Sequence, residues 1–329
     1  MGAADSRSDL IERNELRAGK AVSSLERRLE QLPDSHPASP RYARDTSGPA
    51  TDARPLTDAE HAEHVPEVRM LLDEARESGL ATDAQHTIDK KREVWSDERE
   101  TMHDGMVEDL YSRSAAVPCE GRAILAGGLP GSGKTTVLHA HAGIDLSQYM
   151  MINPDDIKEE MARRGLVPEV DGLSPMEASD LVHEESSYVA KRLANRAESD
   201  QRNVIWDITL SRTSSAAERV ESLRKAGYGE VNAIFVDISI EVSARRADNR
   251  HREGSDQYRA GDGLGGRFLP SETILRYSDP DWGSQNRKNF EELKSRFDTW
   301  SRFDNSVDGR APVLVETRPE HANDRSEKQ

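Results

Sequence analysis

The sequence has a single cysteine and no long apolar run. Because Cys119 is the only cysteine among 329 residues, an intramolecular disulfide and a cysteine-based zinc site are both excluded. No segment approaches the roughly 20 apolar residues that a membrane-spanning helix needs. The N-terminal residues MGAADSRSDLIERNE lack the apolar core of a signal peptide. We therefore expect a cytoplasmic protein without a membrane partner.

Positive charge and aromatic residues are also scarce. The chain has 45 lysines and arginines against 61 aspartates and glutamates, which gives a formal net charge of −16 at pH 7. This charge disfavours nucleic acid and anionic membranes as partners, although a local basic cluster can still hold phosphates. Only 35% of the residues are hydrophobic and 5% aromatic, so we expect part of the chain to be extended or solvated. The length allows one large α/β domain with an appendage.

The most informative segment is residues 122–138, RAILAGGLPGSGKTTVL. Its first apolar residues predict a short buried strand, and the next eight residues fit the phosphate-loop pattern of glycine, four residues and Gly-Lys-Thr. The glycines let successive backbone N–H groups point at one phosphate, and the following helix directs its positive dipole end there. We expect Lys134 to contact the β- and γ-phosphates of ATP and the Thr135 hydroxyl to hold Mg²⁺. The predicted nucleotide-binding residues are Gly128, Leu129, Pro130, Gly131, Ser132, Gly133, Lys134, Thr135 and Thr136.

The residues before this segment predict helices joined by a linker. An apolar stripe over residues 10–32 indicates an amphipathic helix or a coiled-coil seam, and the proline-containing residues 33–55 indicate a flexible linker. Capping boxes that begin at Thr57 and Thr82, and a cap at Ser96, predict further helices.

The charged residues 97–100 at the start of the third of these helices are expected to be solvated surface. We divide the chain into a helix and linker (1–56), a helical module (57–115) and a phosphate-binding domain (116–329). The domain is expected to end in a disordered tail from about residue 318.

Downstream of the phosphate loop, short apolar segments alternate with helical patterns. We expect strands at 149–153, 203–207 and 231–237, and helices at 156–163, 174–199, 216–226 and 241–252. This alternation predicts a parallel sheet with helices on both faces. Ligands in such sheets lie beyond the carboxyl ends of the strands.

Two of these strand ends carry carboxylates. Asp155 and Asp156 follow the first, where a carboxylate can accept a proton from a hydroxyl or hold Mg²⁺ through water. Either could instead only cap the next helix, and adjacent aspartates allow one for each task. Asp207 ends the second strand, with the Thr209 hydroxyl two residues on, although an aspartate there is also a common turn residue. Two acidic strand ends that face one phosphate loop are typical of a kinase.

Arginines cluster in the last predicted helix, and the next segment is rich in glycine. The helix carries Arg245, Arg246, Arg250 and Arg252, and glycines between residues 261 and 266 precede Arg267. Glycine-rich segments between helices behave as lids, and arginine suits a transferring phosphoryl group. We expect one helix arginine and Arg267 to be functional and the others to be surface.

A short acidic segment, residues 183–186 (HEES), lies inside the long predicted helix. A zinc site would require a second histidine four residues after His183, but that position is Ser187. Substrate contact through Glu184 and plain helix surface both stay open.

These motifs together resemble the zeta-toxin family of P-loop kinases, the toxin halves of bacterial toxin–antitoxin pairs. The resemblance covers about residues 116–310 and rests on the order and spacing of the motifs. It implies an α/β fold of the P-loop NTPase type, a three-layer sandwich with a mostly parallel sheet, here preceded by an α-helical N-terminal extension. It also implies that ATP and Mg²⁺ are used to phosphorylate a UDP-N-acetylaminosugar, typically the 3′-hydroxyl of UDP-N-acetylglucosamine.

The resemblance also implies roles for single residues. Asp155, in an Asn-x-Asp strand end, matches the catalytic base, and Lys158 matches the lysine that follows it in the family. Arg250 and Arg267 match the lid arginines, with Arg246 as the alternative one turn earlier.

One strand end departs from the family pattern. The family has Glu-Gly-Thr where this chain has Asp207-Ile208-Thr209. The carboxylate is shorter and a bulky side chain is added, so the acceptor identity stays open here. We expect Asp207, Thr209, Lys158 and Glu184 to contact the acceptor.

Alternatives remain for the acceptor and for the N-terminal residues. The acceptor could be another hydroxyl, on a dinucleotide ribose, an antibiotic or a polynucleotide end, or the protein could be an ATP-dependent switch without transfer. Residues 1–115 could inhibit the kinase in cis, in place of a separate antitoxin protein, or serve oligomerisation. A toxic kinase must be restrained, which favours inhibition.

Overall fold

The computed structural model describes residues 54–318, all of which belong to one compact unit. The helix predicted for residues 10–32, nearly all of the predicted linker at 33–55, and the predicted tail from residue 319 onward lie outside the described residues. Within 54–318, no helix is long and apolar enough to cross a membrane.

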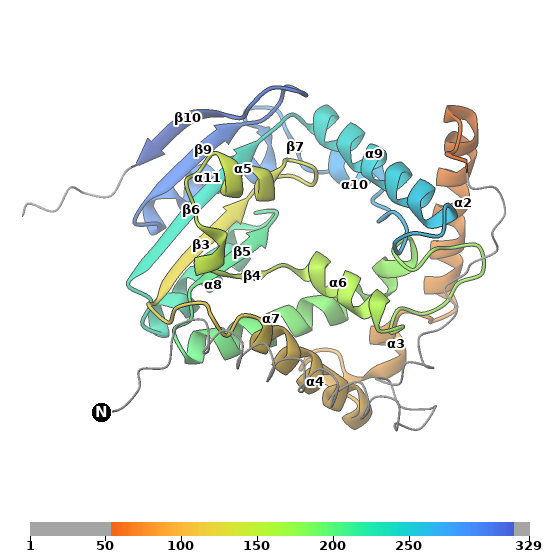
Figure 1. The fold of residues 1–329 in the computed structure, drawn as a ribbon, viewed down its shortest axis with the longest axis horizontal. Coiled ribbons are helices and arrows are strands. Elements are labelled where there is room, and N and C mark those ends of the chain that lie inside the picture. Colours follow the sequence, from red (N-terminus) through yellow and green to blue (C-terminus); the bar gives the residue numbers. More distant parts are fainter. Residues whose placement is uncertain (1–53, 319–329) are drawn as a thin grey trace, which may run out of the picture. The chain divides into compact units, whose positions relative to one another are not determined.

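A six-stranded, mostly parallel sheet forms the centre of the described chain (Figure 1). Its strand order is β10-β9-β6-β3-β5-β4, and within this sheet only β10 runs antiparallel to its neighbour. The strands are β3 (Arg122–Gly127), β4 (Met150–Ile152), β5 (Val204–Ile208), β6 (Glu230–Asp237), β9 (Trp300–Asp304) and β10 (Val313–Arg318). The four strands expected from the sequence are thus present as β3 to β6, and the predicted α/β fold class is confirmed.

Helices cover both faces of this sheet, because alternate residues of each strand point to opposite sides. Ile124 and Ala126 of β3 face α5, whereas Ala123 and Leu125 face the larger core built with α7, α8 and α11. The helices are α2 (Asp58–Glu77), α3 (Thr82–His86), α4 (Asp97–Arg113), α5 (Lys134–Ala140), α6 (Pro154–Arg163), α7 (His183–Ser199), α8 (Thr213–Lys225), α9 (Ile240–Arg259), α10 (Ser271–Leu275) and α11 (Gln285–Leu293).

Shorter elements connect these helices and strands. Within residues 54–318, three 3₁₀ segments occur, η2 (Leu146–Gln148), η3 (Ala178–Val182) and η4 (Lys294–Arg296). In the same residues two small hairpins pair β1 (Thr87–Asp89) with β2 (Val94–Trp95), and β7 (Ser278–Asp279) with β8 (Gly283–Ser284).

Two predicted helices differ from expectation. The helix expected over residues 174–199 is divided into η3 and α7, after a turn in which Ser174 and Glu177 cap each other. Helix α9 continues to Arg259, so Gly254 lies inside it. A Cβ on Gly254 would lie 2.5 Å from Gly266 Cα. Glycine is therefore needed at this position because the segment around Gly266 packs against the helix, and it does not end the helix.

The predicted helix caps were right at two positions and wrong at one. Thr57 and Ser96 cap α2 and α4 as expected. Thr82 lies inside α3, whose N-cap is Ala81, because the Thr82 hydroxyl donates to the Leu181 carbonyl instead. The expected capping box at Thr82 was therefore overridden by a tertiary contact.

The N-terminal helices α2 and α4 are part of the core. Val68 and Leu72 of α2 and Met106 of α4 are buried in the same hydrophobic cluster as residues of the sheet and α7. The expectation that residues 97–100 are all solvated was wrong for Arg99, which is buried and binds Glu185 with an Nε–Oε1 distance of 2.5 Å. A buried carboxylate needs a cation, and α4 supplies it.

Candidate active site

The phosphate loop joins β3 to α5, and its backbone depends on glycine. Gly128, Gly131 and Gly133 have φ angles of 150°, 70° and 82°, in the region that disfavours other residues. A Cβ on Gly128 would lie 2.5 Å from the Val236 carbonyl oxygen, and one on Gly133 would lie 2.6 Å from Asn305 Nδ2. The loop therefore forms a close-packed cradle of backbone, the geometry that suits a phosphate.

Side chains from α9 and from the segment after β9 hold this loop. The Ser243 hydroxyl donates to the Pro130 carbonyl (2.6 Å), the Arg246 guanidinium to the Gly131 carbonyl (3.2 Å) and the Asn305 amide to the Ser132 carbonyl (2.8 Å). Arg246 also pairs with Asp308. Arg246 is thus engaged with the loop and is not a plain surface residue, although we expected only one helix arginine to be functional. Ser243 and Asn305 were missed, because their contacts exist only in the folded chain.

The groups around the loop fit a nucleoside triphosphate and a divalent cation. The Ser132 hydroxyl is buried and has no hydrogen-bond partner within residues 54–318. Thr135 and Thr136 are exposed on the first turn of α5. Lys134 Nζ lies 3.3 Å from the Gly128 carbonyl oxygen and 3.3 Å from Asp207 Oδ1. Hydroxyl and carboxylate oxygens are the ligands that Mg²⁺ takes together with phosphate oxygens.

The carboxylates after β4 lie on the first turn of α6. Asn153 caps this helix by accepting the Asp155 backbone N–H at 2.9 Å, so the cap task falls to Asn153 and leaves both aspartates for other contacts. The Asp156 side chain is exposed, yet its partial enclosure by protein and the nearby carboxylates of Glu159 and Asp207 raise its pKa to about 6. The negative charges on this side of the site are therefore close enough to repel one another.

The two predicted lid arginines reach the same place from different segments. Arg267, in the loop between α9 and α10, forms an ion pair with Asp155. Arg250 of α9 has its pKa lowered first by desolvation and then by the charge of Arg267, while Asp155 and Asp207 act in the opposite direction. Burial raises the pKa of Asp207, and the positive charges of Lys134 and Arg250 act against this increase. Arg250 therefore lies near both strand-end carboxylates, and Arg267 is bound to Asp155.

Lys158, one turn after Asp155, is 2% exposed. Its ammonium donates to His183 Nδ1 at 3.2 Å. Burial, and next the charge of Arg267, lowers the pKa of Lys158 to about 8. Glu184 is exposed, and its charge acts on both Lys158 and His183. Lys158 and Glu184 are thus neighbours, and His183, which we did not select, joins them.

The strand end after β5 is fixed by α11. Leu210 adopts a left-handed conformation with φ 59°, which is unfavourable for a residue with a Cβ. The buried side chain of Asn286 donates to the Thr209 carbonyl, and that of Asn289 donates to the Leu210 carbonyl at 2.7 Å. Asn286 and Asn289 therefore hold Asp207 and Thr209 in their positions, and no local pattern in the sequence indicates it.

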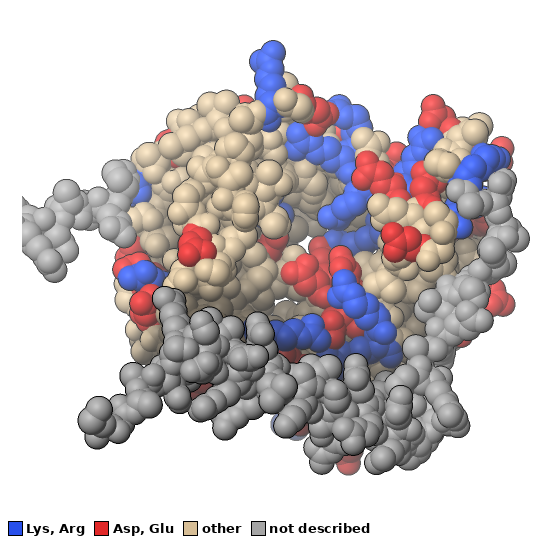
Figure 2. Space-filling model, in the orientation of Figure 1, with Lys and Arg blue, Asp and Glu red and all other residues tan. Residues whose placement is uncertain are grey.

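The charged side chains of this site lie close together. Figure 2 shows acidic and basic residues side by side around a central opening on this face of the molecule. The structure brings together Lys134, Asp155, Lys158, Asp207, Arg250 and Arg267. A donor loop, two carboxylates and several cations in one cleft can bind phosphates and take a proton from an acceptor.

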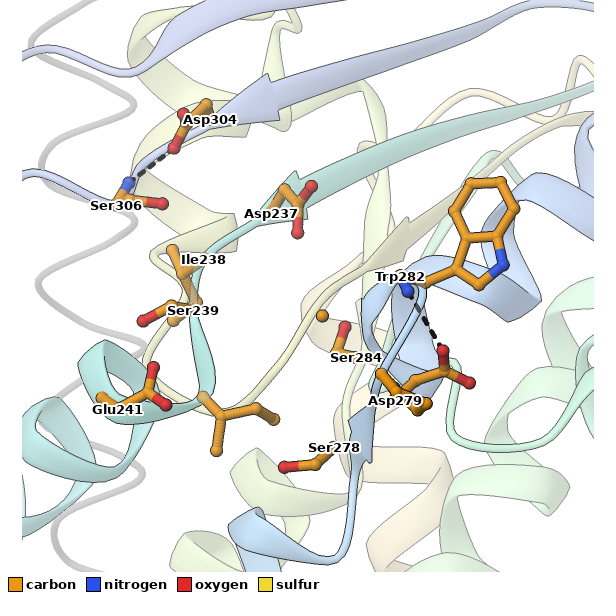
Figure 3. A pocket seen from close by; sticks show the side chains of 13 residues that line it. Asp237, Ile238, Ser239, Glu241, Ser278, Asp279, Trp282, Ser284, Asp304 and Ser306 are labelled. Atoms are coloured by element: carbon orange, nitrogen blue, oxygen red, sulfur yellow. Dashed lines mark hydrogen bonds between the residues drawn. The ribbon is translucent and has the colours of Figure 1, made fainter.

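A separate pocket of about 580 Å³ lies at the carboxyl ends of β6 and β9 (Figure 3). It is lined by four carboxylates, of Asp237, Glu241, Asp279 and Asp304. Each already has a partner: Asp237 pairs with Arg287, Glu241 is hydrogen-bonded by Ser239, and Asp279 and Asp304 accept backbone N–H groups. The pocket contains none of the predicted phosphate-binding residues, and its acidity does not suit an anion.

Comparisons with known proteins agree with this geometry. The zeta toxin family model matches residues 119–279, a range that begins just before β3 and includes the phosphate loop, both strand-end carboxylates and both lid arginines. A comparison with curated proteins gave no match.

Solved structures give a similar result for the fold. The crystal structure of AvrRxo1-ORF1:-ORF2 with ATP has 16% sequence identity and a TM-score of 0.54, covering 72% of this chain and 76% of that chain. The AvrRxo1-ORF1:AvrRxo1-ORF2 structure with sulphate ions has 19% identity and a TM-score of 0.52 over the same shares. The PezAT toxin–antitoxin system of Streptococcus pneumoniae has 17% identity and a TM-score of 0.49, covering 68% of this chain and 81% of that chain.

Proposed function

Because residues 119–279 belong to the zeta-toxin family, we propose that this protein is an ATP-dependent kinase that phosphorylates a hydroxyl group of a UDP-N-acetylaminosugar. The proposed acceptor is the 3′-hydroxyl of UDP-N-acetylglucosamine, with Asp155 as the general base. Family membership and the phosphate loop support the ATP-dependent part. The proposed identity of the acceptor rests on the family resemblance alone.

One observation supports phosphoryl transfer over simple nucleotide binding. Two of the cations that would contact the transferred phosphate are paired with strand-end carboxylates: Lys134 lies 3.3 Å from Asp207, and Arg267 is bonded to Asp155. A nucleotide switch can use one strand-end carboxylate to hold Mg²⁺, but it has no need of a second carboxylate that receives a proton from an acceptor. A kinase needs both, since one set holds the donor and the other receives the acceptor.

The pairing implies a sequence of events in the site. A triphosphate in the loop carries more negative charge than a single carboxylate, so it competes for Lys134 and Arg267. When Arg267 binds the phosphate instead, the Asp155 carboxylate is free to accept a proton. Mg²⁺, held by the Thr135 hydroxyl together with the phosphates, would neutralise charge on the donor.

Transfer then needs one bond formed and one broken. The acceptor hydroxyl oxygen attacks the γ-phosphorus while its proton passes to Asp155, and the bond between the γ-phosphorus and the bridging oxygen breaks to release ADP. Lys134, Arg250 and Arg267 stabilise the negative charge on the transferring group. Lys158, Asp207 and Thr209 would orient the acceptor.

The test is direct. The purified full-length protein is incubated with ATP, Mg²⁺ and a panel of UDP-sugars, and products are identified by mass spectrometry. We expect UDP-N-acetylglucosamine to gain one phosphate. Hydrolysis of ATP without transfer to any UDP-sugar would overturn the proposed acceptor.

A second set of acceptors belongs in the same panel because of one residue. Ile208 stands where the family has glycine, and its side chain adds bulk beside Asp207. Dinucleotides, hydroxyl-bearing antibiotics and polynucleotide ends should therefore be included. If one of these were phosphorylated instead of a UDP-sugar, the proposed kinase function would stand and the proposed substrate would be wrong.

We also propose that restraint of this kinase comes from a separate antitoxin protein and not from α2 and α4. Arg99 and His103 of α4 bind the buried Glu185 of α7, and His64 of α2 binds the buried Glu177, so these helices are engaged with structural carboxylates. Expression of the full chain alone should then arrest growth, whereas a Lys134→Met variant should not. Normal growth with the unaltered chain would instead support inhibition in cis.

A further inference from the structure

Both lid arginines lie next to His251 in the folded chain. Arg250 precedes His251 in α9. Gly266, which precedes Arg267, packs so closely on α9 that a Cβ there would lie 1.8 Å from the His251 carbonyl oxygen. The His251 ring also packs edge-on against Phe268, with centroids 5.3 Å apart. A shift of His251 would therefore move the residues on either side of Arg267 as well as Arg250.

Side chains on the face of α9 around His251 contact α2. His61 Nε2 of α2 lies 3.2 Å from Asp248 Oδ1. Arg252 pairs with Asp58 at 2.6 Å. Residues 248 and 255 share the face of His251 because they are three and four positions away from it, and Arg252 is four positions from Asp248. Arg250 projects elsewhere. Helix α2 thus braces α9 from the side away from the phosphates.

A buried carboxylate is at the centre of this brace. Glu177 Oε1 accepts hydrogen bonds from His64 Nε2 (2.7 Å), His251 Nε2 (3.0 Å) and Ser255 Oγ (3.0 Å), and Oε2 accepts from Ser174. The rings of His64 and His251 are stacked, with an interplanar angle of 3°. The cluster ties α2, the segment before η3 and the lid helix α9 together at one point.

Three potential ligand atoms of His64, Glu177 and His251 lie within 4.8 Å of one another, so a metal ion has to be considered. A metal-bound histidine normally donates its other ring N–H to an acceptor. His251 Nδ1 is buried and has no partner within the described residues. When Nε2–H donates to Glu177 instead, Nδ1 is unprotonated and needs no acceptor. The geometry therefore favours a hydrogen-bonded cluster without metal.

We propose that His64, Glu177 and His251 are positioning residues that hold Arg250 and Arg267 at the transferring phosphoryl group. The inference rests on the proposed kinase function and assigns to the N-terminal helix α2 a part in assembling the reaction site. His64 lies on α2, in the module that precedes the region matched by the family model. A displacement of about 1 Å in a catalytic group costs about a hundredfold in rate, so a loosened brace should be measurable.

The test compares binding of a transition-state mimic with binding of product, and needs no acceptor. For full-length protein, the affinity for Mg·ADP–aluminium fluoride is divided by that for Mg·ADP. His64→Ala should lower this ratio about tenfold, because the arginines act mainly on the mimic of the transferring group. His64→Gln, whose amide can donate to Glu177 in place of the imidazole, should restore it to within about threefold.

The matched control is His103→Ala. His103 Nε2 donates to the buried Glu185 Oε1 at 2.6 Å, the same chemistry at a distance from the arginines. Both alanine variants should lower the melting temperature, but only His64→Ala should change the ratio. Equal ratios in His64→Ala and the unaltered protein, or an equal fall in His103→Ala, would overturn the proposal.

A double-mutant cycle sharpens this result. In an Arg250→Ala, Arg267→Ala background, His64→Ala should cause no further loss of the ratio, since the groups that it positions are already absent. A full additional tenfold loss would contradict the positioning role. Failure to phosphorylate any acceptor would reject only the proposed substrate, because the ratio is measured without one.

Discussion

The phosphate loop and the arginine-bearing side of the cleft are built in different ways. The loop is one continuous segment whose three glycines have positive φ angles. The arginine side is assembled from α2, α6, α9 and the loop before α10, joined by Glu177 and by the Arg267–Asp155 pair. The first depends on local backbone conformation, whereas the second depends on contacts between segments up to two hundred residues apart in sequence.

Because the two regions are built differently, substitutions in them should impair function in different ways. A change in the loop acts on phosphate binding directly. A change in α2 or α4 acts at a distance, because these helices supply hydrogen-bond donors to two buried carboxylates. Experiments that separate the two regions should therefore separate nucleotide binding from transfer.

Removal of residues 1–115 should have the largest effect. The fragment 116–329 loses both Arg99 and His103 from Glu185, and a buried carboxylate left unpaired costs about 3–5 kcal/mol. Glu177 loses His64 but keeps His251. The fragment also exposes the apolar surface that α2 and α4 cover. Domains are stable by only about 5–15 kcal/mol. We expect no cooperative unfolding transition by circular dichroism, and a sharp transition in the fragment would show that the arginine side needs no brace.

Substitutions on the two sides of the cleft should differ next. Lys134→Met should lower transfer by about a thousandfold and also weaken ATP binding, because Lys134 belongs to the loop. Asp155→Asn should lower transfer by about a hundredfold to ten-thousandfold while ATP affinity, measured by calorimetry, changes little. This contrast would confirm that donor and acceptor functions are divided between the two regions.

Asp156→Asn is the control for Asp155→Asn. Asp156 Oδ1 accepts from the Asn153 side chain at 3.2 Å, and its exposed carboxyl has no arginine pair among its described contacts. We expect at most a few-fold loss of transfer. If Asp156→Asn were the inactive variant and Asp155→Asn active, the assignment of the base would be wrong.

Lys158→Met tests stability and should stabilise the protein. Burial lowers the pKa of Lys158 from 10.5 to about 8, so below pH 8 folding has to bury a charged ammonium. This penalty is relieved between pH 8 and 10.5, where the folded state releases the proton that the unfolded chain retains. The interval corresponds to about 3 kcal/mol. Urea denaturation should show a gain of that order at pH 7, and the gain should shrink at pH 10.

An equal gain at both pH values would mean that packing of the methionine, and not the buried charge, is responsible. Transfer should fall in the same variant if Lys158 contacts the acceptor. The two measurements together tell a functional lysine from a structural one.

Much of the fold follows from the sequence because its signals are local. The short apolar runs of β3, β4, β5 and β6 and the caps at Thr57 and Ser96 were read correctly from neighbouring residues. Strands β9 and β10 were missed. All side chains of β10 are exposed or only partly buried, so its sequence has no buried face to indicate a strand.

The site could be predicted in part for the same reason. Asp155 and Asp207 stand at strand ends, which the alternation of strands and helices locates. Arg246 and Arg250 could not be told apart, because both lie on one helix and only the fold shows that Arg246 binds the loop carbonyl of Gly131. Arg99 appeared to be surface because its neighbours are charged, yet it pairs with a glutamate 86 residues away.

The position of the phosphate loop follows from the sequence alone, because the glycine spacing permits the positive φ angles that the loop needs. The tertiary structure decided which cation meets which carboxylate. Glu177 and Glu185 are ordinary acidic residues in a charged sequence until folding buries them. Once buried they must find partners, and only the folded chain brings these partners from α2, α4 and α9.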